Sequence, residues 1–144
     1  MLYRLVYISK ASKDLDDREL AEILSVSREN NLRKEITGLL LFVDSGFLQV
    51  LEGEKNQVEK LYEHIGLDSR HFTVKRLQSG ETGERLFGDW SMAYSPISPE
   101  EKRTLVGDGD FFAKFSASSA SDEQTQELLK FIGTVAERMV RASQ

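Results

Sequence analysis

The sequence predicts a single α+β domain that continues into a helical extension. Two patterns support this prediction: apolar and polar residues alternate over residues 2–8, as in a strand, and apolar residues recur at helical spacing over residues 54–65. The 144 residues suffice for one domain, and 40% apolar with 30% charged residues is the composition of a globular protein with a core.

The elements of the domain can be placed in order along the chain. Alternating or continuous apolar runs predict strands over residues 2–8, 36–43, 47–52, 72–79 and 87–94. Helical spacing predicts one helix from Asp16, a capping residue, toward Asn31, and a second from about Glu54 to Ile65. The order β-α-β-β-α-β-β begins with the ferredoxin-like split βαβ arrangement, in which two helices cover one face of an antiparallel sheet.

Residues 96–144 are expected to form a separate helical extension of a domain that spans residues 1–95. Ser98 followed by Pro99 and Glu101 is a helix start with a capping box. The last helix is predicted from about Asp122 to Arg141, with an apolar stripe on one side. Phenylalanines lie between the two helices, at Phe111, Phe112 and Phe115. Because the sheet has a second apolar face, we expect this helical cap to cover it.

Composition excludes several classes of function. Lys and Arg total 19 against 24 Asp and Glu, and the net charge of -5 argues against a nucleic-acid-binding face. The absence of cysteine excludes disulfides and thiolate sites, and two histidines make a histidine-built metal centre unexpected. No apolar run approaches the roughly 20 residues of a membrane span. We therefore expect a cytoplasmic protein without nucleic-acid or membrane partners.

Three polar side chains occupy positions where apolar ones would be expected. Tyr7 and Gln49 share strand faces with apolar neighbours, and Asn31 ends the apolar stripe of the first helix. Each alone is explained by a buried polar group paired with nearby backbone. Three such residues together are harder to explain by backbone pairing alone, because burying an unpartnered amide costs roughly 1–3 kcal/mol of folding free energy. A planar heterocycle between apolar walls would supply the missing partners.

Two further groups of residues allow a structural and a functional interpretation. Trp90 and Met92 alternate on the last predicted strand, so we expect them to face the same way, either as core or beside a ligand. Arg70 and His71 follow the second helix and either pair locally or reach a polar edge of the ligand. Arg33, just beyond Asn31, has the same two interpretations.

Taken in order, these residues resemble the BLUF family, the sensors of blue light using flavin. The resemblance covers residues 2 to about 95. It rests on Tyr7, on residues 30–38 and 47–53, on Asp68 to His71, and on Trp90 to Met92. The Asn-x-x-x-x-Ile-Thr-Gly and Gln-x-Leu-Glu-Gly runs are specific together. The resemblance implies noncovalently bound FAD, or FMN, between the two helices and one sheet face.

The resemblance also assigns roles to individual residues. The photoactive residues would be Tyr7, Gln49, Trp90 and Met92. The cofactor-binding residues would be Asn31, Gln49, Arg33, Arg70 and His71. Asn31 would hold the edge of the flavin ring and Gln49 would bridge Tyr7 and the ring. Where many relatives carry a histidine directly before the ring-binding asparagine, this chain has Asn30.

The function implied is that of a photoreceptor and not of an enzyme. Light would rearrange the amide of Gln49, by rotation or tautomerisation, and the change would pass from the last strand to the helical cap and on to a downstream signalling protein. A homo-oligomer is also expected. Two alternatives remain: a protein-interaction module, and a flavin-free ferredoxin-like hydrolase, which would need a phosphate-cradling loop that the glycine-free connection from Ser9 to Asp16 does not offer.

Overall fold

The centre of the molecule is a five-stranded sheet in the order β4-β1-β3-β2-β5. The computed structural model describes residues 2–12, 16–43, 46–69, 71–95, 97–107, 109–110, 114–115 and 122–142. The strands are β1 (Leu2–Ala11), β2 (Thr37–Val43), β3 (Gly46–Glu54), β4 (His71–Glu81) and β5 (Ala93–Tyr94). The first four pair antiparallel, as predicted, and β5 pairs parallel with β2 at the edge.

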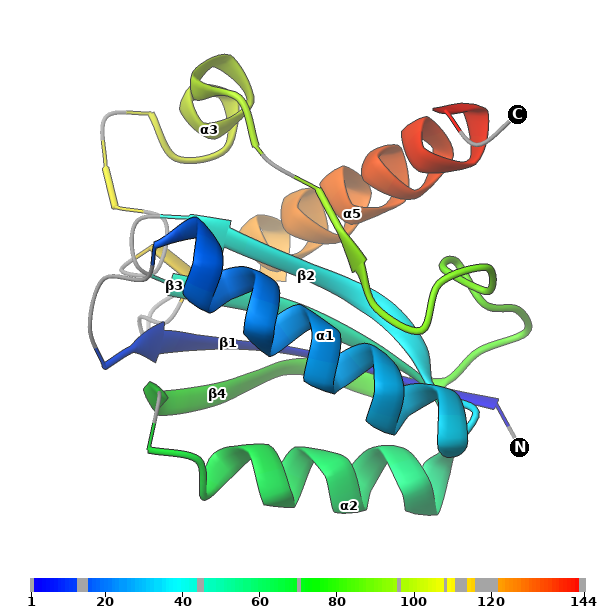
Figure 1. Cartoon of the computed structure of the whole chain (residues 1–144). Helices are drawn as coiled ribbons and strands as arrows, with labels where there is room; N and C mark the ends of the chain where they lie inside the picture. The colour runs from blue at the N-terminus through cyan, green and yellow to red at the C-terminus, as the bar shows by residue number, and fades with distance from the viewer. Residues whose placement is uncertain are drawn as a thin grey trace.

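Two helices cover one face of this sheet, as the sequence predicted (Figure 1). They are α1 (Asp17–Arg33), between β1 and β2, and α2 (Lys55–Gly66), between β3 and β4. The carboxylate of Asp16 caps α1 by accepting the backbone N–H of Glu19 at 2.8 Å. Each helix links two strands between which a third strand lies in the sheet, so both helices belong to split βαβ units. Their inner sides face the same sheet surface.

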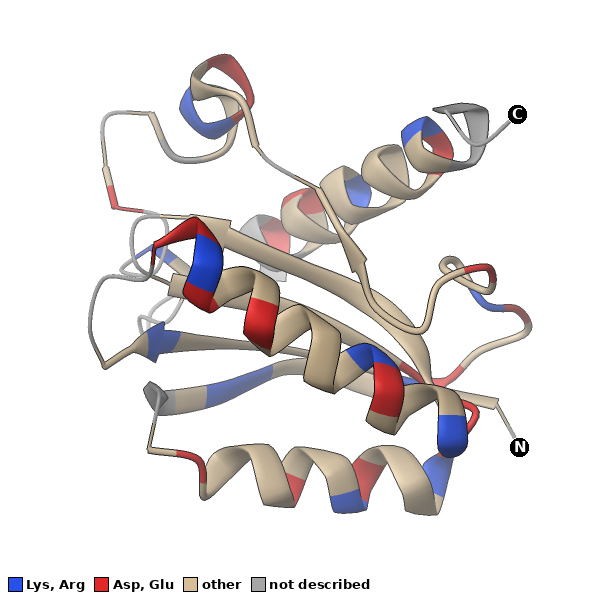
Figure 2. Ribbon diagram, viewed as in Figure 1, with Lys and Arg blue, Asp and Glu red and all other residues tan. Residues whose placement is uncertain are grey.

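The strands divide their side chains between two cores, because successive residues of a strand point to opposite faces. On the face covered by α1 and α2, the strands bury Leu5, Tyr7, Leu40, Phe47 and Leu51. On the opposite face they bury Val6, Ile8, Leu39, Leu41, Leu48 and Val50. Charged residues occur on α1, α2, α3, α5 and β4 and in the loops, while β2 and β3 are almost free of them (Figure 2).

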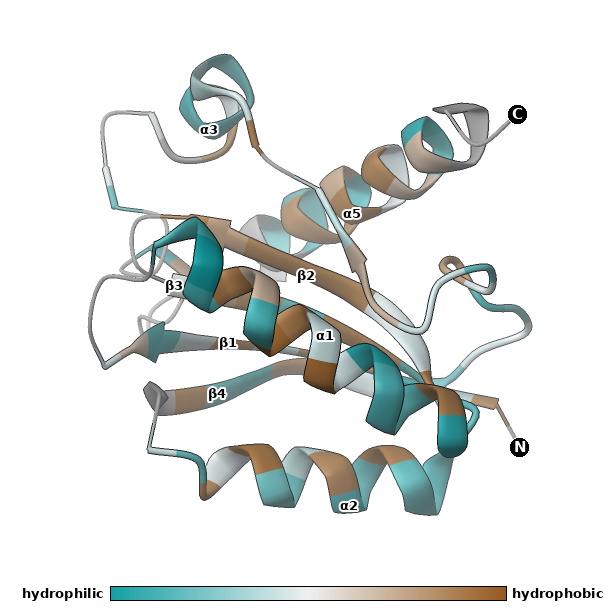
Figure 3. Ribbon diagram, in the orientation of Figure 1, coloured by the Kyte–Doolittle hydropathy of each residue, from teal (hydrophilic) through white to brown (hydrophobic). Residues whose placement is uncertain are grey.

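The opposite face is covered by the C-terminal helix α5 (Asp122–Ala142), which confirms the predicted helical cap. Its apolar stripe inserts Leu128, Ile132 and Val135 into that core, and Figures 1 and 3 show α5 crossing behind the sheet with its hydrophobic residues in brown. The shorter helix α3 (Pro99–Val106) begins with the predicted capping box. Of the three phenylalanines, Phe115 is buried in this core, whereas Phe111 and Phe112 lie outside the described residues.

The predicted last strand is wrong in its extent, since β5 spans only Ala93–Tyr94 and most of residues 82–92 are irregular. The side chain of Glu52 explains this irregular backbone. The backbone N–H groups of Leu86 and Phe87 donate to the carboxylate of Glu52, at 2.7 and 3.0 Å, instead of to a neighbouring strand. Within the described residues, no helix is long and apolar enough to cross a membrane.

The packing of α5 leads to a stability prediction. Leu128→Ala should lower the free energy of unfolding by about 2–5 kcal/mol, because the fully buried leucine would leave a cavity between α5 and the sheet. Urea denaturation measures this change. Leu32→Ala is the control, since Leu32 is 73% exposed and its loss should change stability by about 0.5 kcal/mol or less. Equal effects of the two substitutions would contradict the packing described here.

Candidate functional site

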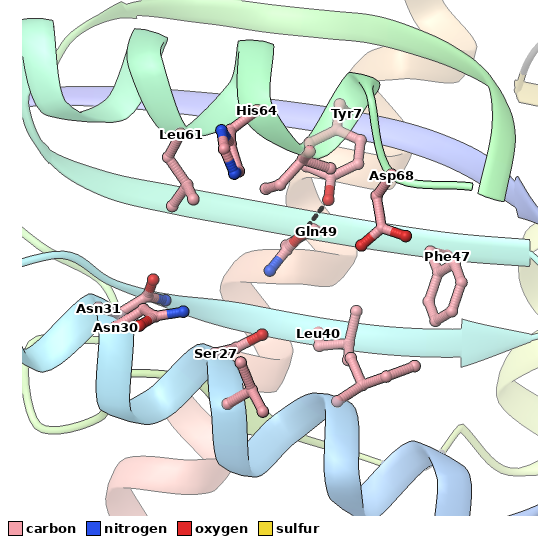
Figure 4. Close-up of a pocket in the computed structure, with 13 residues that line it drawn as sticks. Tyr7, Ser27, Asn30, Asn31, Leu40, Phe47, Gln49, Leu61, His64 and Asp68 are labelled. Carbon is pink, nitrogen blue, oxygen red and sulfur yellow. Dashed lines mark hydrogen bonds between the residues drawn. The ribbon is translucent and has the colours of Figure 1, made fainter. Parts of the chain in front are cut away.

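A pocket of about 150 Å³ lies between α1, α2 and the sheet (Figure 4). Its apolar wall consists of Ile23, Val26, Leu40, Phe47, Leu61 and Ile65. The polar side chains that line it come from both helices and from the central strands, so the pocket joins segments distant in sequence. This is the face on which the sequence places Tyr7, Asn31 and Gln49, and the structure brings all three into the pocket wall.

Tyr7 and Gln49 form the floor of the pocket. They are register partners on β1 and β3, so their side chains leave the sheet side by side on one face. The Tyr7 hydroxyl donates to Oε1 of Gln49, as the dashed line in Figure 4 marks. At its other end, Nε2 of Gln49 donates to Sδ of Met92 at 3.5 Å. The three buried side chains thus form one hydrogen-bonded chain from β1 across β3 to the segment before β5.

The surroundings of Tyr7 keep its phenol neutral. Burial raises the pKa of Tyr7 well above its ordinary value. Tyr62 and Asp68 raise it further, because negative charge on these neighbours would repel a phenolate at Tyr7. The Tyr62 ring meets the Tyr7 ring edge to face, with centroids 5.4 Å apart. Tyr7 therefore keeps its proton, and its role as donor to Gln49, throughout the neutral range.

Helix α1 holds the main chain of the segment that carries Met92. Nδ2 of Asn31 donates to the carbonyl oxygen of Ser91 at 2.8 Å, and Nε of Arg28 donates to that of Met92, also at 2.8 Å. Asn31 lines the pocket as well, so its amide connects the pocket to this segment. Sequence reasoning missed Arg28, because its acceptor is a main-chain carbonyl distant in the sequence.

Trp90 and Met92 do not face the same way, which corrects the sequence analysis. Met92 is 1% exposed and belongs to the core under α1 and α2, whereas Trp90 packs against the core under α5. The prediction assumed the alternation of a strand. Residues 90–92 are not in a strand, so their side chains follow the turn at Phe87 to Trp90, where the N–H of Trp90 donates to the carbonyl of Phe87 at 3.0 Å.

Of the three predicted cationic contacts of the cofactor, only the side chain of Arg33 lies in the described part of the chain. Arg33 donates to Oδ1 of Asn30 at 2.7 Å on the exposed end of α1, and it is not among the described lining residues. Arg70 lies outside the described residues, and for His71 only the backbone, in β4, is described. The pocket also contains Ser27, which sequence reasoning missed although it lies one helical turn before Asn31.

The pocket has the chemistry that a flavin ring requires. The apolar wall can cover the faces of a planar heterocycle, and the amides of Asn31 and Gln49 offer donors and acceptors to its edge. Among the described residues, no group of three or more His, Asp or Glu is placed to hold a metal ion.

Comparison with known proteins agrees with this chemistry. Residues 2–93 match the family model described as "BLUF: Sensors of blue-light using FAD". The chain is 35% identical over 106 residues to the blue light- and temperature-regulated antirepressor BluF of Escherichia coli (strain K12). That alignment covers 74% of this chain but only 26% of BluF, so the chain spans about a quarter of that relative.

Solved structures of similar length match over most of both chains. The ground state of BlsA has a TM-score of 0.75 and 30% identity, and the match covers 90% of this chain and 86% of BlsA. The dark-state structure of BlrB, described as a BLUF protein, has a TM-score of 0.73 and 29% identity, and covers 93% of this chain and 96% of BlrB.

Proposed function

The chain belongs to the BLUF family of blue-light sensors that use FAD, and from this premise we propose that Tyr7, Gln49 and Met92 are its light-responsive unit. BLUF domains bind flavin as their chromophore, as the sequence analysis predicted. The observation that carries the proposal is the hydrogen-bonded chain from the Tyr7 hydroxyl through the Gln49 amide to the sulfur of Met92.

The three side chains suit a reversible switch. Bound flavin supplies the absorption of blue light and, once excited, a strong oxidising power. Tyr7 is a buried neutral phenol that can release and recover a proton at its hydroxyl. Gln49 has an acceptor at one end and a donor at the other, so reversing or tautomerising the amide changes both contacts at once. The thioether of Met92 is a weak acceptor, which lets Gln49 leave it at little cost.

The other residues predicted to bind flavin or to take part in the switch are supported to different degrees by their contacts. Asn31 is proposed to hold the ring edge, because its amide lines the pocket. Arg70 and His71 stay predicted contacts of the cofactor's polar groups. Arg33 pairs with Asn30 instead, which does not support a role in binding. Of the two predicted switching residues, Met92 is supported by its bond to Gln49, whereas Trp90 packs on the opposite face.

The route by which the light response leaves the sensor domain is also a proposal. Residues 1–95 would act as sensor and residues 96–144 as the layer that relays the response to a separate signalling protein, without catalysis by this chain. The antirepressor BluF and the photoactivated adenylate cyclase subunits of Euglena gracilis, which match over part of their length, give precedent for a sensor coupled to an effector. A homo-oligomer and a cytoplasmic location stay predictions.

A visible absorption spectrum before and after blue illumination tests the function. The purified chain, loaded with FAD, should show a flavin spectrum that shifts slightly to the red in light and returns in the dark. An unchanged spectrum of the loaded protein would overturn the proposed switch. Failure to bind either FAD or FMN would favour the alternatives, a flavin-free hydrolase or an interaction module.

Removal of the ring-edge amide should weaken flavin binding. Asn31→Ala is expected to raise the dissociation constant of FAD about 5- to 150-fold, the equivalent of roughly 1–3 kcal/mol of lost pairing. Titration of the apoprotein, followed by flavin fluorescence, measures it. Glu29→Gln, at an exposed position of the same helix, should bind as the wild type does. Equal dissociation constants for the two variants would exclude Asn31 from the site.

The pH dependence of the light response reports on Tyr7. Because burial raises the pKa of this phenol, Tyr7 stays protonated as the pH rises, and the amplitude of the red shift should be constant from about pH 6 through about pH 10. Difference spectra at each pH, with circular dichroism to verify folding, measure the amplitude. Loss of the signal with a midpoint near the ordinary tyrosine value of about 10 would contradict the role of Tyr7.

A further inference from the structure

A polar junction joins the end of β5 to both C-terminal helices. Arg138, on α5, donates from Nη1 to Oε2 of Glu101 at 2.8 Å and from Nη2 to Oγ of Ser95 at 2.9 Å. Ser95 is 6% exposed and directly follows β5, three residues after Met92. One guanidinium therefore holds the strand end and the first turn of α3 at the same time.

Glu101 makes this junction part of the start of α3. Its Oε1 accepts the backbone N–H of Ser98 at 3.1 Å in the capping box, while its Oε2 accepts from Arg138. Although burial opposes ionisation, these hydrogen bonds and the charge of Arg138 hold the pKa of Glu101 below its usual value. The carboxylate is thus charged at neutral pH, and a movement of Arg138 would act on the cap of α3.

The segment between the pocket and this junction is short, and its strand pairing is limited. β5 pairs with β2 at only two register positions, Ala93 with Leu39 and Tyr94 with Leu40. On the pocket side, the segment is held by Asn31 at the Ser91 carbonyl, by Arg28 at the Met92 carbonyl and by the contact of Gln49 with the Met92 sulfur. On the cap side it is held by Arg138 at Ser95. Ser95, which contacts Arg138 of α5, lies only three residues after Met92, so a displacement of Met92 can reach α5 through a short stretch of backbone.

We propose that Arg138 is the positioning residue that couples movement of the Met92 segment to α3 and α5. In the dark, the planar guanidinium spans Ser95 and Glu101. When Gln49 rearranges and releases Met92, Ser95 moves away from Arg138, which keeps only Glu101, and the ends of α3 and α5 loosen. Because a guanidinium offers several N–H groups in a fixed plane, it holds two acceptors in one geometry, whereas the three rotatable donors of a lysine ammonium do not fix that geometry. This inference rests on the proposed function.

Hydrogen exchange of the FAD-loaded full chain, dark against lit, tests the coupling in residues 99–106 and 122–142. In the wild type, light should raise exchange in both helices. Ser95→Ala, which removes one oxygen, and Arg138→Gln should raise exchange in the dark and lose the difference between dark and light. Both should keep the red shift, because neither residue lines the pocket. Lys130→Gln, which removes a charge at an exposed position of α5, is the matched control and should respond as the wild type does.

Two conservative variants separate the junction from general packing. Ser95→Thr keeps the hydroxyl and should keep the light response, whereas Arg138→Lys keeps the charge but not the double contact and should lose it. A wild-type red shift together with an undiminished exchange response in Ser95→Ala and Arg138→Gln would overturn the inference, as would equal loss in Lys130→Gln. An absent red shift in the wild type would overturn the proposed function itself, and the inference with it.

Discussion

In the Tyr7→Phe variant we expect flavin to stay bound and the light-induced red shift to be absent. The substitution removes only the hydroxyl that donates to Oε1 of Gln49. The ring itself stays in the core under α1 and α2, against the ring of Tyr62, so the pocket keeps its shape. Without the hydroxyl, no proton donor remains at Oε1 of Gln49, so light can no longer trigger the rearrangement of the amide's hydrogen bonds. Difference spectra after illumination measure the loss.

Tyr62→Phe is the matched control for this experiment. Tyr62 is the neighbouring phenol, and its ring carries the guanidinium of Arg76 at 4.8 Å from its centroid. Phenylalanine keeps both the edge-to-face contact with Tyr7 and the cation–π contact, so Tyr62→Phe should retain the red shift. A normal light response in Tyr7→Phe, or an equal loss in both variants, would show that the Tyr7 hydroxyl is not the specific donor.

The largest loss of stability is expected at Glu52. Its carboxylate is fully buried and accepts four hydrogen bonds, from Nε of Arg4 at 3.2 Å, Oγ1 of Thr37 at 3.1 Å and the backbone N–H groups of Leu86 and Phe87. Glu52→Leu leaves these donors and the charge of Arg4 without their acceptor. The free energy of unfolding should fall by about 3–5 kcal/mol, the cost of breaking a buried ion pair from one side.

Urea denaturation of the variants separates this network from an ordinary surface pair. Glu52→Gln keeps one oxygen acceptor and should lose less stability than Glu52→Leu. Glu22→Leu removes an exposed carboxylate that pairs with Arg18 at 3.6 Å and should change stability by about 0.5 kcal/mol or less. If Glu52→Leu unfolds at the same urea concentration as the wild type, the network does not hold residues 84–87 in place.

The elements with strong periodicity were predictable from the sequence, and so was part of the site. The strands and helices up to β4 follow local patterns, and Tyr7, Asn31 and Gln49 stood out as polar residues on apolar faces. That contrast is readable because a face is a local property: the neighbours at i+2 or i+4 define it. The structure places these three residues in one pocket wall, as the pattern indicated.

The end of the sheet could not be predicted in this way. Around Trp90 and Met92 the sequence alternates like a strand, but the backbone there has other partners: the carboxylate of Glu52, and the N–H of Gly38, which donates to the Trp90 carbonyl at 3.3 Å. Arg28 was missed for the same reason, since its acceptor is a main-chain carbonyl at residue 92. Contacts of side chains with a distant backbone have no periodicity for a sequence pattern to reveal.

The division of β3 between two cores has a consequence for how this chain can change over evolution. Gln49 faces the pocket, while its neighbours Leu48 and Val50 face the core under α5. Insertion or deletion of a single residue before Gln49 in β3 would reverse that assignment for every residue beyond it, placing the amide under the helical cap and an aliphatic side chain in the flavin pocket. Single substitutions can alter the pocket or the cap separately, but a change of length between Gly46 and Gln49 would disrupt light sensing and the packing of the cap together.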